Sequence, residues 1–460
     1  MPGPLLLAGP PVVDLDDHVR RGGGDGIEIA RRYGPVETVE ELEASGLRGR
    51  GGAGFPTGLK WRSILDGGEA AGDRFAVANG AEGEPGTFKD RTLLRHDPYA
   101  VLEGLLIAAR TVGARRAFVA LKASFAAELD RVRRAMAEMA AAGWLRDVSI
   151  EVVEGPDEYL FGEEKGLLQV IQGEDPLPGI FPPYVHGLFS TAPQVGWSAG
   201  EDRSSTGPTV PSSNPTLVNN VETLANVPVI LREGAAAFRR FGTLESPGTV
   251  ICTVGGDTVR HGVGEYALGT PLEQVIVELG GGLPDGRAVR YVVSGVANPV
   301  IRGEDVTVPV SYEGLESVGS GLGAAGFTVY DDRTDPVELA AAVSRFLGVE
   351  SCGQCPACKL GTAAITDDLE RLADEGGDAR RIAVIDARLV GVTDASRCYL
   401  PTQEQRVVGS LLPDMRDPQA RRGTSHRGLL VTKLVDLVGD RFLVDLAQAR
   451  KRPDWTYEPE

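Results

Sequence analysis

Three cysteines spaced two residues apart are the feature that most constrains this chain. Cys352, Cys355 and Cys358 form a C-x-x-C-x-x-C loop, and Cys398 follows forty positions later. This spacing lets three thiolates converge on one cluster while the intervening backbone amides point toward it, and the remote cysteine supplies the fourth ligand. The pattern therefore predicts a [4Fe-4S] site that joins a tight loop to a second, distant segment.

Other roles for these cysteines fit less well. Structural zinc more often uses two separate C-x-x-C pairs. A disulfide framework needs an oxidising compartment, a small domain and usually an even cysteine count, whereas this chain has five cysteines in 460 residues. The fifth, Cys252, lies in an apolar run typical of a strand. These considerations favour iron–sulfur over zinc.

Length and charge bound the function. A chain of 460 residues is expected to form two to four domains. The net charge of −18, from 65 acidic and 47 basic residues, argues against nucleic acid as a partner. The N-terminus has no basic region of the kind that begins a signal peptide, and no run is apolar enough to cross a bilayer. We therefore expect a soluble, cytoplasmic protein in which thiolates stay available for a cluster.

The first half of the chain alternates strands and helices. Strands are expected near residues 75–79, 117–121 and 148–154. Asp97-Pro98 is a typical helix start, and its helix is expected to run to about residue 112. Further helices are expected over about 123–142, over 156–172 and from 218 onward. This alternation predicts an α/β fold with a largely parallel sheet.

The second half divides differently. A long Pro-, Ser- and Gly-rich loop is expected over about 176–216. Short β-rich runs over 247–330, among them 305–310, surround one helix near 271–279 and predict a small β-grasp-like domain. From Asp335-Pro336 to about residue 450 the periodicity is helical. The expected division is an N-terminal tail (1–34), an α/β domain (35–245), a β-grasp domain (246–332), a helical cluster domain (333–445) and a C-terminal tail (446–460).

A glycine-rich block runs from Gly49 to Gly54. It satisfies G-x-G-x-x-G, but the segment before it has helical spacing, so it is not an ordinary dinucleotide turn. Its bare amides can still surround a phosphate or a flavin ring, with positive charge from Arg48, Arg50 and Lys60. The alternative is a glycine-rich surface turn.

Further polar blocks follow predicted elements. Residues 79–91 come directly after a strand, and ligands of open α/β sheets bind at the carboxyl ends of strands; a solvated loop is the alternative. Glu163 and Glu164 are adjacent on a predicted helix, so at most one can face a pocket. Asn219 and Asn220 begin a predicted helix, where they can cap it or help to bind an anion. No pattern supports a hydrolase.

Taken in order, these blocks resemble the flavoprotein subunit that carries FMN and one [4Fe-4S] cluster in respiratory complex I, and its relatives in NAD-linked hydrogenases and formate dehydrogenases. The likeness covers about residues 35–440. It implies a Rossmann-like FMN domain, a ubiquitin-like (SLBB-like) β-grasp domain and a helical iron–sulfur domain. The blocks that carry it are Gly46–Trp61, Asn79–Arg91, Glu158–Glu164, Pro215–Pro228 and the cysteine loop with Cys398.

The resemblance also implies ligand contacts. Those to FMN are Gly49, Gly51, Gly52, Lys60, Asn79, Glu82, Tyr159, Gly162, Glu163, Val218, Asn219, Asn220 and Thr223. Those to NADH are Phe55, Glu84, Glu164 and Phe181. The cluster ligands it implies are the same four cysteines that the spacing predicts.

The chain departs from the family pattern at several positions. Ala81 stands where the family has an aspartate that contacts flavin. Ser63 lies in the segment where a second phenylalanine is usual, and Pro178 replaces a lysine that helps to bind NADH. The loop before Pro215 is longer than usual, and Lys165 follows the glutamate pair where a small residue is common. These departures weaken the expectation for NADH more than that for FMN.

The expected activity is that of an NADH dehydrogenase in which electrons pass from NADH through FMN to the cluster. Flavin is needed because a hydride carries two electrons and a cubane accepts one. No catalytic side chain is required for the hydride step. Because no further cysteine motif follows, a partner iron–sulfur protein or quinone-linked complex is expected. The rival interpretation is an electron-relay or scaffold subunit without productive NADH oxidation; reverse flow to NAD would use the same sites.

Overall fold

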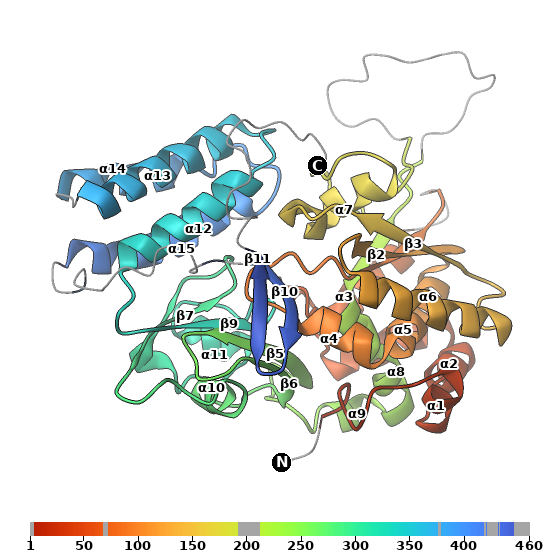
Figure 1. Ribbon diagram of the computed structural model, residues 1–460. Coiled ribbons are helices and arrows are strands. Elements are labelled where there is room, and N and C mark those ends of the chain that lie inside the picture. Colours follow the sequence, from red (N-terminus) through yellow and green to blue (C-terminus); the bar gives the residue numbers. More distant parts are fainter. Residues whose placement is uncertain are drawn as a thin grey trace.

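The computed structural model describes residues 4–67, 72–191, 212–375, 379–417, 420, 431 and 433–445 (Figure 1). The predicted C-terminal tail, 446–460, and the middle of the predicted long loop, 192–211, lie outside these residues. In the described part of the chain, no helix has both the length and the apolar character that crossing a bilayer requires.

A four-stranded parallel sheet forms the centre of the first domain, with the strand order β3-β2-β1-β4. Its strands are β1 (Phe75–Asn79), β2 (Arg116–Lys122), β3 (Ser149–Gly155) and β4 (Thr216–Asn220). The three strands expected here are confirmed, and all pairs are parallel. Asn79 pairs with both Ala120 and Asn220. The residues that end the neighbouring strands therefore meet at one edge of the sheet.

Helices surround this sheet, and one large apolar core joins them to it. They are α1 (Leu15–Arg20), α2 (Asp25–Ser45), α3 (Thr57–Leu65), α4 (Lys89–His96), α5 (Pro98–Val112), α6 (Ala126–Ala141), α7 (Glu164–Ile171), α8 (Val221–Glu233) and α9 (Ala235–Phe238). The predicted start of α5 is confirmed, because Asp97 accepts a hydrogen bond from the backbone N–H of Ala100 and Pro98 opens the first turn. The α/β fold class is confirmed.

The N-terminal segment is not a loose tail over residues 4–34, which corrects the expectation. Leu6, Val12 and Leu15 lie in the core. The backbone N–H groups of three consecutive residues, Leu5 among them, donate to the carboxylate of Glu265. The apolar side chains at the N-terminus therefore cover the α/β domain, and α2 begins well before residue 35.

Two predicted helices are wrong in part. Residues 156–172 divide into a 3-10 turn, η2 (Tyr159–Gly162), and α7, because Glu163 is extended and caps α7. Residues 218–220 belong to strand β4, because they pair in parallel with the last three residues of β1. The predicted capping by Asn220 is confirmed, as its Oδ1 accepts from the backbone N–H of Glu222 at 3.0 Å.

The second domain is a five-stranded mixed sheet with the order β6-β5-β9-β7-β8. Its elements are β5 (Thr249–Gly256), β6 (Gly262–Ala267), α10 (Leu272–Gly280), β7 (Val289–Ser294), β8 (Ile301–Arg302), η3 (Gly303–Asp305), α11 (Tyr312–Ser317) and β9 (Gly326–Asp331). The run 305–310 is not a strand. It begins in η3, packs Val308 and Val310 into the core of this domain, and bonds to the start of α10 through backbone hydrogen bonds and an isolated bridge between Pro309 and Pro271.

Four helices form a bundle that carries the cysteines (Figure 1). They are α12 (Pro336–Glu350), α13 (Pro356–Glu375), α14 (Ala379–Gly391) and α15 (Leu400–Arg416). Asp335 caps α12 and Pro336 lies in its first turn, as predicted.

Residues 433–445, which follow the bundle, are not helical, which corrects the expected extent of the helical domain. Residues 433–445 form an antiparallel hairpin of β10 (Lys433–Val438) and β11 (Arg441–Asp445) between the first two domains (Figure 1). The ring of Phe442 lies 5.6 Å from that of Phe88 and 5.4 Å from that of His261. Gly439, with φ 62°, supplies the turn that the helical interpretation overlooked.

Candidate functional site

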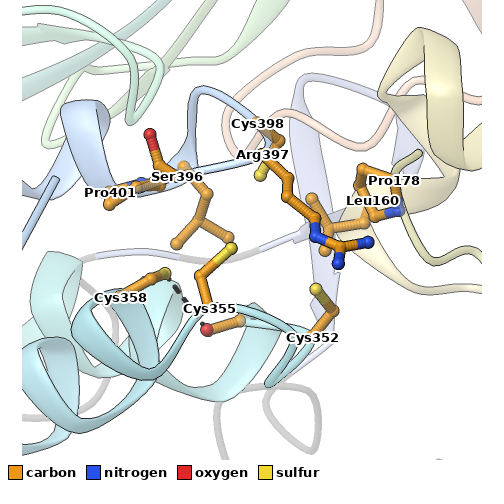
Figure 2. A pocket seen from close by; sticks show the side chains of 11 residues that line it. Leu160, Pro178, Cys352, Cys355, Cys358, Ser396, Arg397, Cys398 and Pro401 are labelled. Carbon is orange, nitrogen blue, oxygen red and sulfur yellow. Dashed lines mark hydrogen bonds between the residues drawn. The ribbon is translucent and has the colours of Figure 1, made fainter. Parts of the chain in front are cut away.

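The four predicted cysteine ligands border one hollow (Figure 2). Cys352 and Cys355 precede α13, Cys358 lies in its first turn, and Cys398 lies just before α15. The space between these side chains, open solvent included, is about 290 Å³. Its remaining lining is Leu160, Pro178, Ser351, Ser396, Arg397, Leu400 and Pro401. The fold therefore brings the remote Cys398 to the cysteine loop, as the spacing predicts.

The thiols suit a multi-iron cluster. Burial raises the pKa of Cys358 to about 11 and that of Cys398 to about 12, so thiolates here need a positive partner. Iron supplies that charge, and Ser351 Oγ, 3.2 Å from Cys358 Sγ, offers a hydrogen bond to the thiolate. The donor set fits a [4Fe-4S] cluster.

The glycine-rich loop lies against the carboxyl end of β4. The backbone N–H of Arg50 donates to Thr223 Oγ1 at 2.8 Å. A Cβ on Gly51 would come 3.1 Å from Cβ of Asn220, so the loop passes close to the strand end. Gly52 has φ +132°, and a Cβ there would meet nothing within 4 Å. The side of Gly52 on which a side chain would stand therefore faces open space, while its backbone bridges Gly323. A flavin or phosphate cradle requires such an opening.

The cations of this loop are engaged within the protein, contrary to their expected role as free positive charge. The guanidinium of Arg50 is buried and donates to the backbone oxygens of Arg48, Pro247 and Thr249. Arg48 donates to the backbone oxygen of Gly54 at 2.7 Å. Both arginines hold the loop in shape.

The asparagines at the strand ends are also engaged. Asn79 donates to the backbone oxygen of Gly162 at 2.9 Å, and Asn219 accepts from Trp61 Nε1 at 2.9 Å. Asn220 accepts from Lys89 Nζ at 3.1 Å and donates to Asp90 Oδ2 at 2.8 Å. These amides join the loops around the predicted FMN position.

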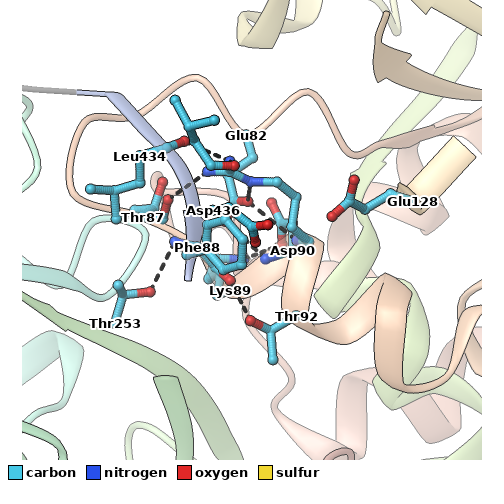
Figure 3. A network of polar contacts seen from close by, with 12 residues as sticks. Glu82, Thr87, Phe88, Lys89, Asp90, Thr92, Glu128, Thr253, Leu434 and Asp436 are labelled. Carbon is cyan, nitrogen blue, oxygen red and sulfur yellow. Dashed lines mark hydrogen bonds and ion pairs between the residues drawn. The ribbon is translucent and has the colours of Figure 1, made fainter. Parts of the chain in front are cut away.

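A buried ionic network is hydrogen-bonded to Asn220 at this edge, and Figure 3 shows part of it. Lys89 Nζ lies 2.6 Å from Asp90 and 2.8 Å from Glu222. Burial lowers the pKa of Lys89, but these two carboxylates outweigh it and raise the pKa above its ordinary value. Glu82, a predicted FMN contact, is paired with Arg91 at 2.8 Å and accepts from the backbone N–H of Asp90. Glu82 therefore fixes the conformation of residues 82–91 through its bonds to Asp90 and Arg91.

Glu84, a predicted NADH contact, joins all three domains. Its carboxylate accepts from Tyr159 Oη at 2.6 Å and from the backbone N–H of Val296 at 2.5 Å. Tyr159 Oη accepts from Gln403 of α15 at 2.6 Å, and its backbone N–H donates to Glu350 at 2.9 Å. Burial raises the pKa of Glu84. The Glu84 and Tyr159 side chains are thus bonded to protein groups.

The two adjacent glutamates behave differently, as expected. Glu163 accepts from the backbone N–H groups of Lys165 and Gly166, and burial raises its pKa. Glu164 has a side chain that is 41% exposed and forms an ion pair with Lys60. This pair links α3 to α7, so a predicted FMN contact and a predicted NADH contact hold each other.

The other predicted contact residues differ in how exposed their side chains are. Phe55 is 56% exposed, and Phe181 is half-buried beside His186. Val218 is buried in an apolar cluster, so only its backbone can face a ligand.

The departures from the family pattern also have structural places. Ala81 is fully buried in the same cluster as Val218. Ser63 donates to the backbone oxygen of Lys60 at 2.8 Å. Pro178 borders the cysteine hollow, and its backbone oxygen accepts from Gln354 at 3.2 Å.

Several residues that hold these sites were missed from the sequence. They are Trp61, Glu222, Tyr312, Glu350 and Gln403. Their roles arise from partners far along the chain, as with Trp61 and Asn219. Of these residues, only Glu350 could have been found from the local sequence, because it lies two residues before the cysteine loop.

The turn η2 connects the two sites. Leu160 borders the cysteine hollow, while Gly162 accepts the hydrogen bond from Asn79 at the edge of the sheet. A single 3-10 turn therefore spans from the thiols to the strand ends.

Comparison with known proteins agrees with both sites. A family model described as the Nuo51 FMN-binding domain matches residues 42–229, and one described as the iron–sulfur binding region of NADH-ubiquinone oxidoreductase F matches residues 338–421. An F subunit of the NADH-quinone oxidoreductase of Rhizobium meliloti is 34% identical over 409 residues, covering 85% of this chain and 91% of the relative. The HndC subunit of the NADP-reducing hydrogenase of Solidesulfovibrio fructosivorans is 31% identical, covering 84% and 76%.

A solved structure is similar as well. The crystal structure of an NAD+-reducing [NiFe]-hydrogenase in the H2-reduced state matches with a TM-score of 0.73 and 30% identity. The match covers 86% of this chain and 64% of that chain, so the present chain spans less than two thirds of its length.

Proposed function

This chain belongs to the family of the F subunits of NADH-quinone oxidoreductase, and from that premise we propose that it passes electrons from NADH through FMN to a [4Fe-4S] cluster and on to a partner iron–sulfur protein. As a family member it is an NADH dehydrogenase module with FMN and a 4Fe-4S cluster. Bound FMN accepts a hydride and releases single electrons. The residues of this chain position the groups and exclude water.

The observation that carries the proposal is the turn η2. Its Leu160 borders the cysteine hollow and its Gly162 bonds Asn79, so the two cofactors would be separated by one short turn. The glycine loop, with Gly51 and Gly52, would hold FMN through backbone N–H groups. Cys352, Cys355, Cys358 and Cys398 would hold the cluster.

The proposed domain roles follow the same division. Residues 35–245 would bind FMN and NADH, with residues 4–34 as part of their packing. Residues 246–332 would form the β-grasp domain and residues 333–417 the cluster domain. The hairpin of β10 and β11 would bind these domains together.

The experiment is an anaerobic preparation analysed for FMN, iron and sulfide, followed by absorption spectra with NADH and then with dithionite. Bleaching of the flavin band and of the cluster absorbance by NADH supports the proposal. Stoichiometric zinc without sulfide would contradict the cluster assignment, and a preparation that takes up no FMN on reconstitution would contradict the flavin assignment.

The second candidate is a relay subunit without productive NADH oxidation. It is favoured by the ion pair of Lys60 with Glu164 and by the engaged carboxylate of Glu84, because NADH would have to displace these contacts. A flavin that dithionite bleaches, but that neither NADH nor NADPH bleaches, would decide for the relay.

The electron partner would dock where the cysteine hollow reaches the surface. Gly353, Pro356, Ser396 and Arg397 are exposed around the cysteines. Arg397 is a cation on a chain whose net charge is −18, and it donates to Gln354 Oε1 at 2.8 Å.

We expect Arg397→Glu to slow reduction of the protein partner severalfold, in a salt-dependent manner, while ferricyanide reduction is unchanged. Arg416→Glu, on the far end of α15, is the control.

A further inference from the structure

Glu404 is a buried carboxyl group next to the cysteine hollow that no role described so far uses. It lies on α15, four residues after Leu400 and three after Pro401, both of which border the hollow. Residues at these spacings share one face of a helix. Glu404 is fully buried. The carboxyl group therefore lies one helical turn behind the wall of the hollow.

The hydrogen bonding of this carboxyl group is incomplete. Oε1 accepts from Ser344 Oγ of α12 at 2.5 Å. Oε2 is buried and has no hydrogen-bond partner among the described residues. An ionised carboxylate with a single donor is strongly disfavoured in the interior, because a buried charge needs several partners. A protonated carboxyl group is the stable form in such a place.

A chain of hydroxyl groups leads away from Glu404. Ser344 Oγ lies 2.8 Å from Thr366 Oγ1, which in turn donates to the backbone oxygen of Thr362 at 2.8 Å. Thr366 is 8% exposed, whereas Ser344 is fully buried. The two hydroxyl groups therefore connect Glu404 with Thr366, the member of this hydrogen-bonded series that retains some exposed surface.

Few buried groups on the helices packed around Glu404 can titrate. Among the buried side chains of α12, α13 and α14, those that titrate are Glu350, Cys358 and Lys359, and α14 buries only Ile382, Ile385 and Leu389. Lys359 donates to the backbone oxygens of Gly348 and Ser351. Glu350 is 3.1 Å from Lys433. Burial raises the pKa of Cys358 most, and a negative charge on Glu404 adds to the rise. A negative charge on the Cys358 thiolate and one on the Glu404 carboxylate therefore repel each other.

We propose that Glu404 is a proton site coupled to reduction of the cluster. This inference rests on the proposed function, in which the four cysteines hold that cluster. One electron from the flavin adds one negative charge at the hollow. One proton from solvent then joins the Glu404 carboxylate through Thr366 and Ser344, and the local charge is unchanged. Each hydroxyl group releases one proton as it accepts another, so the O–H bond on Glu404 is the only net bond formed.

The pH range of the effect follows from the burial. Burial raises the pKa of Glu404 to about 8, while the bond from Ser344 lowers it. Below that pH the carboxyl group is protonated in both redox states, and reduction takes up no proton. Above it the oxidised protein holds a carboxylate, and reduction binds a proton. The midpoint potential of the cluster should therefore be flat at neutral pH and fall on the alkaline side.

The test is a redox titration of the cluster in the whole chain, followed by electron paramagnetic resonance from pH 6 to pH 10. In the natural protein the potential should fall above about pH 8 by up to about 59 mV per pH unit, the one-electron equivalent of a tenfold change in proton activity. Glu404→Gln keeps the shape and cannot titrate, so its potential should stay flat and equal that of the natural protein at pH 7.

Two further variants separate this role from a merely structural one. Ser344→Ala removes the donor to the carboxylate, so the alkaline fall should begin at higher pH. Glu375→Gln removes a carboxylate at the exposed end of α13, 62% exposed, and should leave the fall unchanged. Reduced-minus-oxidised infrared spectra at alkaline pH should show a carboxylic acid band that is gained on reduction and is absent in Glu404→Gln.

Two outcomes overturn the proposal. A flat potential in the natural protein, or an alkaline fall that persists in Glu404→Gln, removes Glu404 as the proton site while the cluster assignment stands. Absence of iron, sulfide and the resonance signal would instead refute the proposed function, and the inference with it.

Discussion

The strand-end edge of the α/β domain and the cysteine hollow of the helical bundle are built on opposite principles. At the strand ends, polar groups are bonded mainly to one another, as Lys89 is to Asp90 and Glu222. In the hollow, four thiols border open space, and burial keeps Cys358 and Cys398 protonated without iron. The first region is therefore organised before any ligand binds. In the second region, we expect the four thiols to become ordered thiolate ligands only when the cluster is bound.

The largest expected effect comes from removing the remote ligand. Cys398→Ala should abolish the cluster, lower the iron and sulfide contents and remove the broad visible absorbance, because three thiolates leave one iron without a protein ligand. Hydrogen exchange should become faster in α12–α15 and stay unchanged in α5 and α8.

The matched control is Cys252→Ala. Cys252 is buried in β5, away from the hollow, so this variant should keep its iron. Equal protection of the bundle with and without iron would refute the contrast between the two regions.

The next effect tests whether the strand-end edge depends on its buried charges. Lys89→Met leaves Asp90 and Glu222 without their shared cation, and breaking a buried ion pair costs about 3–5 kcal/mol. We expect urea denaturation to show a loss of this size and FMN affinity to fall with it. Arg133→Met, which breaks the exposed pair of Arg133 with Glu154, should cost less than about 1 kcal/mol.

A third test concerns the helical layer that the N-terminal segment completes. His18 is buried between Asp97 and Glu103, and although burial lowers its pKa, these carboxylates raise it to about 9 from an ordinary value of 6.5. A raised pKa stabilises the fold fully below pH 6.5, and the stabilisation is lost as the pH rises through 9. The difference corresponds to about 3 kcal/mol.

The measurement is the free energy of unfolding of the natural protein minus that of His18→Gln, followed across this pH range. The difference should shrink as the pH rises. A difference that does not change with pH would show that His18 is not charged in the fold.

The smallest expected effect separates the open side of the glycine loop from its structural side. Gly52→Val places a side chain in open space at φ +132°, where we expect FMN to approach, so FMN affinity should fall at least about tenfold while the cluster is retained. Gly286→Val carries comparable backbone strain, at φ +78° with nothing within 4 Å, and should leave FMN affinity unchanged. Equal FMN affinity in the natural protein and in both variants would show that the glycine loop does not bind FMN.

Local signals predicted the elements that depend on neighbouring residues. The cap and proline of α5, the alternation around β1 and β2, and the spacing of the cysteine loop were all correct. The errors came where distant partners decide. Residues 218–220 are a strand because β1 pairs with them, and residues 4–34 are ordered because Glu265 and the α/β core bind them.

The hairpin and the site residues show the same limit. The run from Leu434 to Leu443 alternates apolar and polar residues only in part, and packing between two domains decides for β10 and β11. The contacts predicted for Asn79, Glu82 and Glu84 stay predictions, and these side chains form hydrogen bonds with protein groups up to 212 residues away. Composition and periodicity carry no information about such partners.

The sequence by itself indicated the tight cysteine loop, the order of the three folds and the glycine loop, because cysteine spacing, periodicity and glycine content act within short stretches of chain. Only the tertiary structure decided that Arg50 and the asparagines are structural, that Lys60 pairs with Glu164, and that Glu404 is buried behind the hollow. Desolvation and hydrogen bonding depend on everything that surrounds a group in space. The same residue type is therefore a ligand in one place and a support in another.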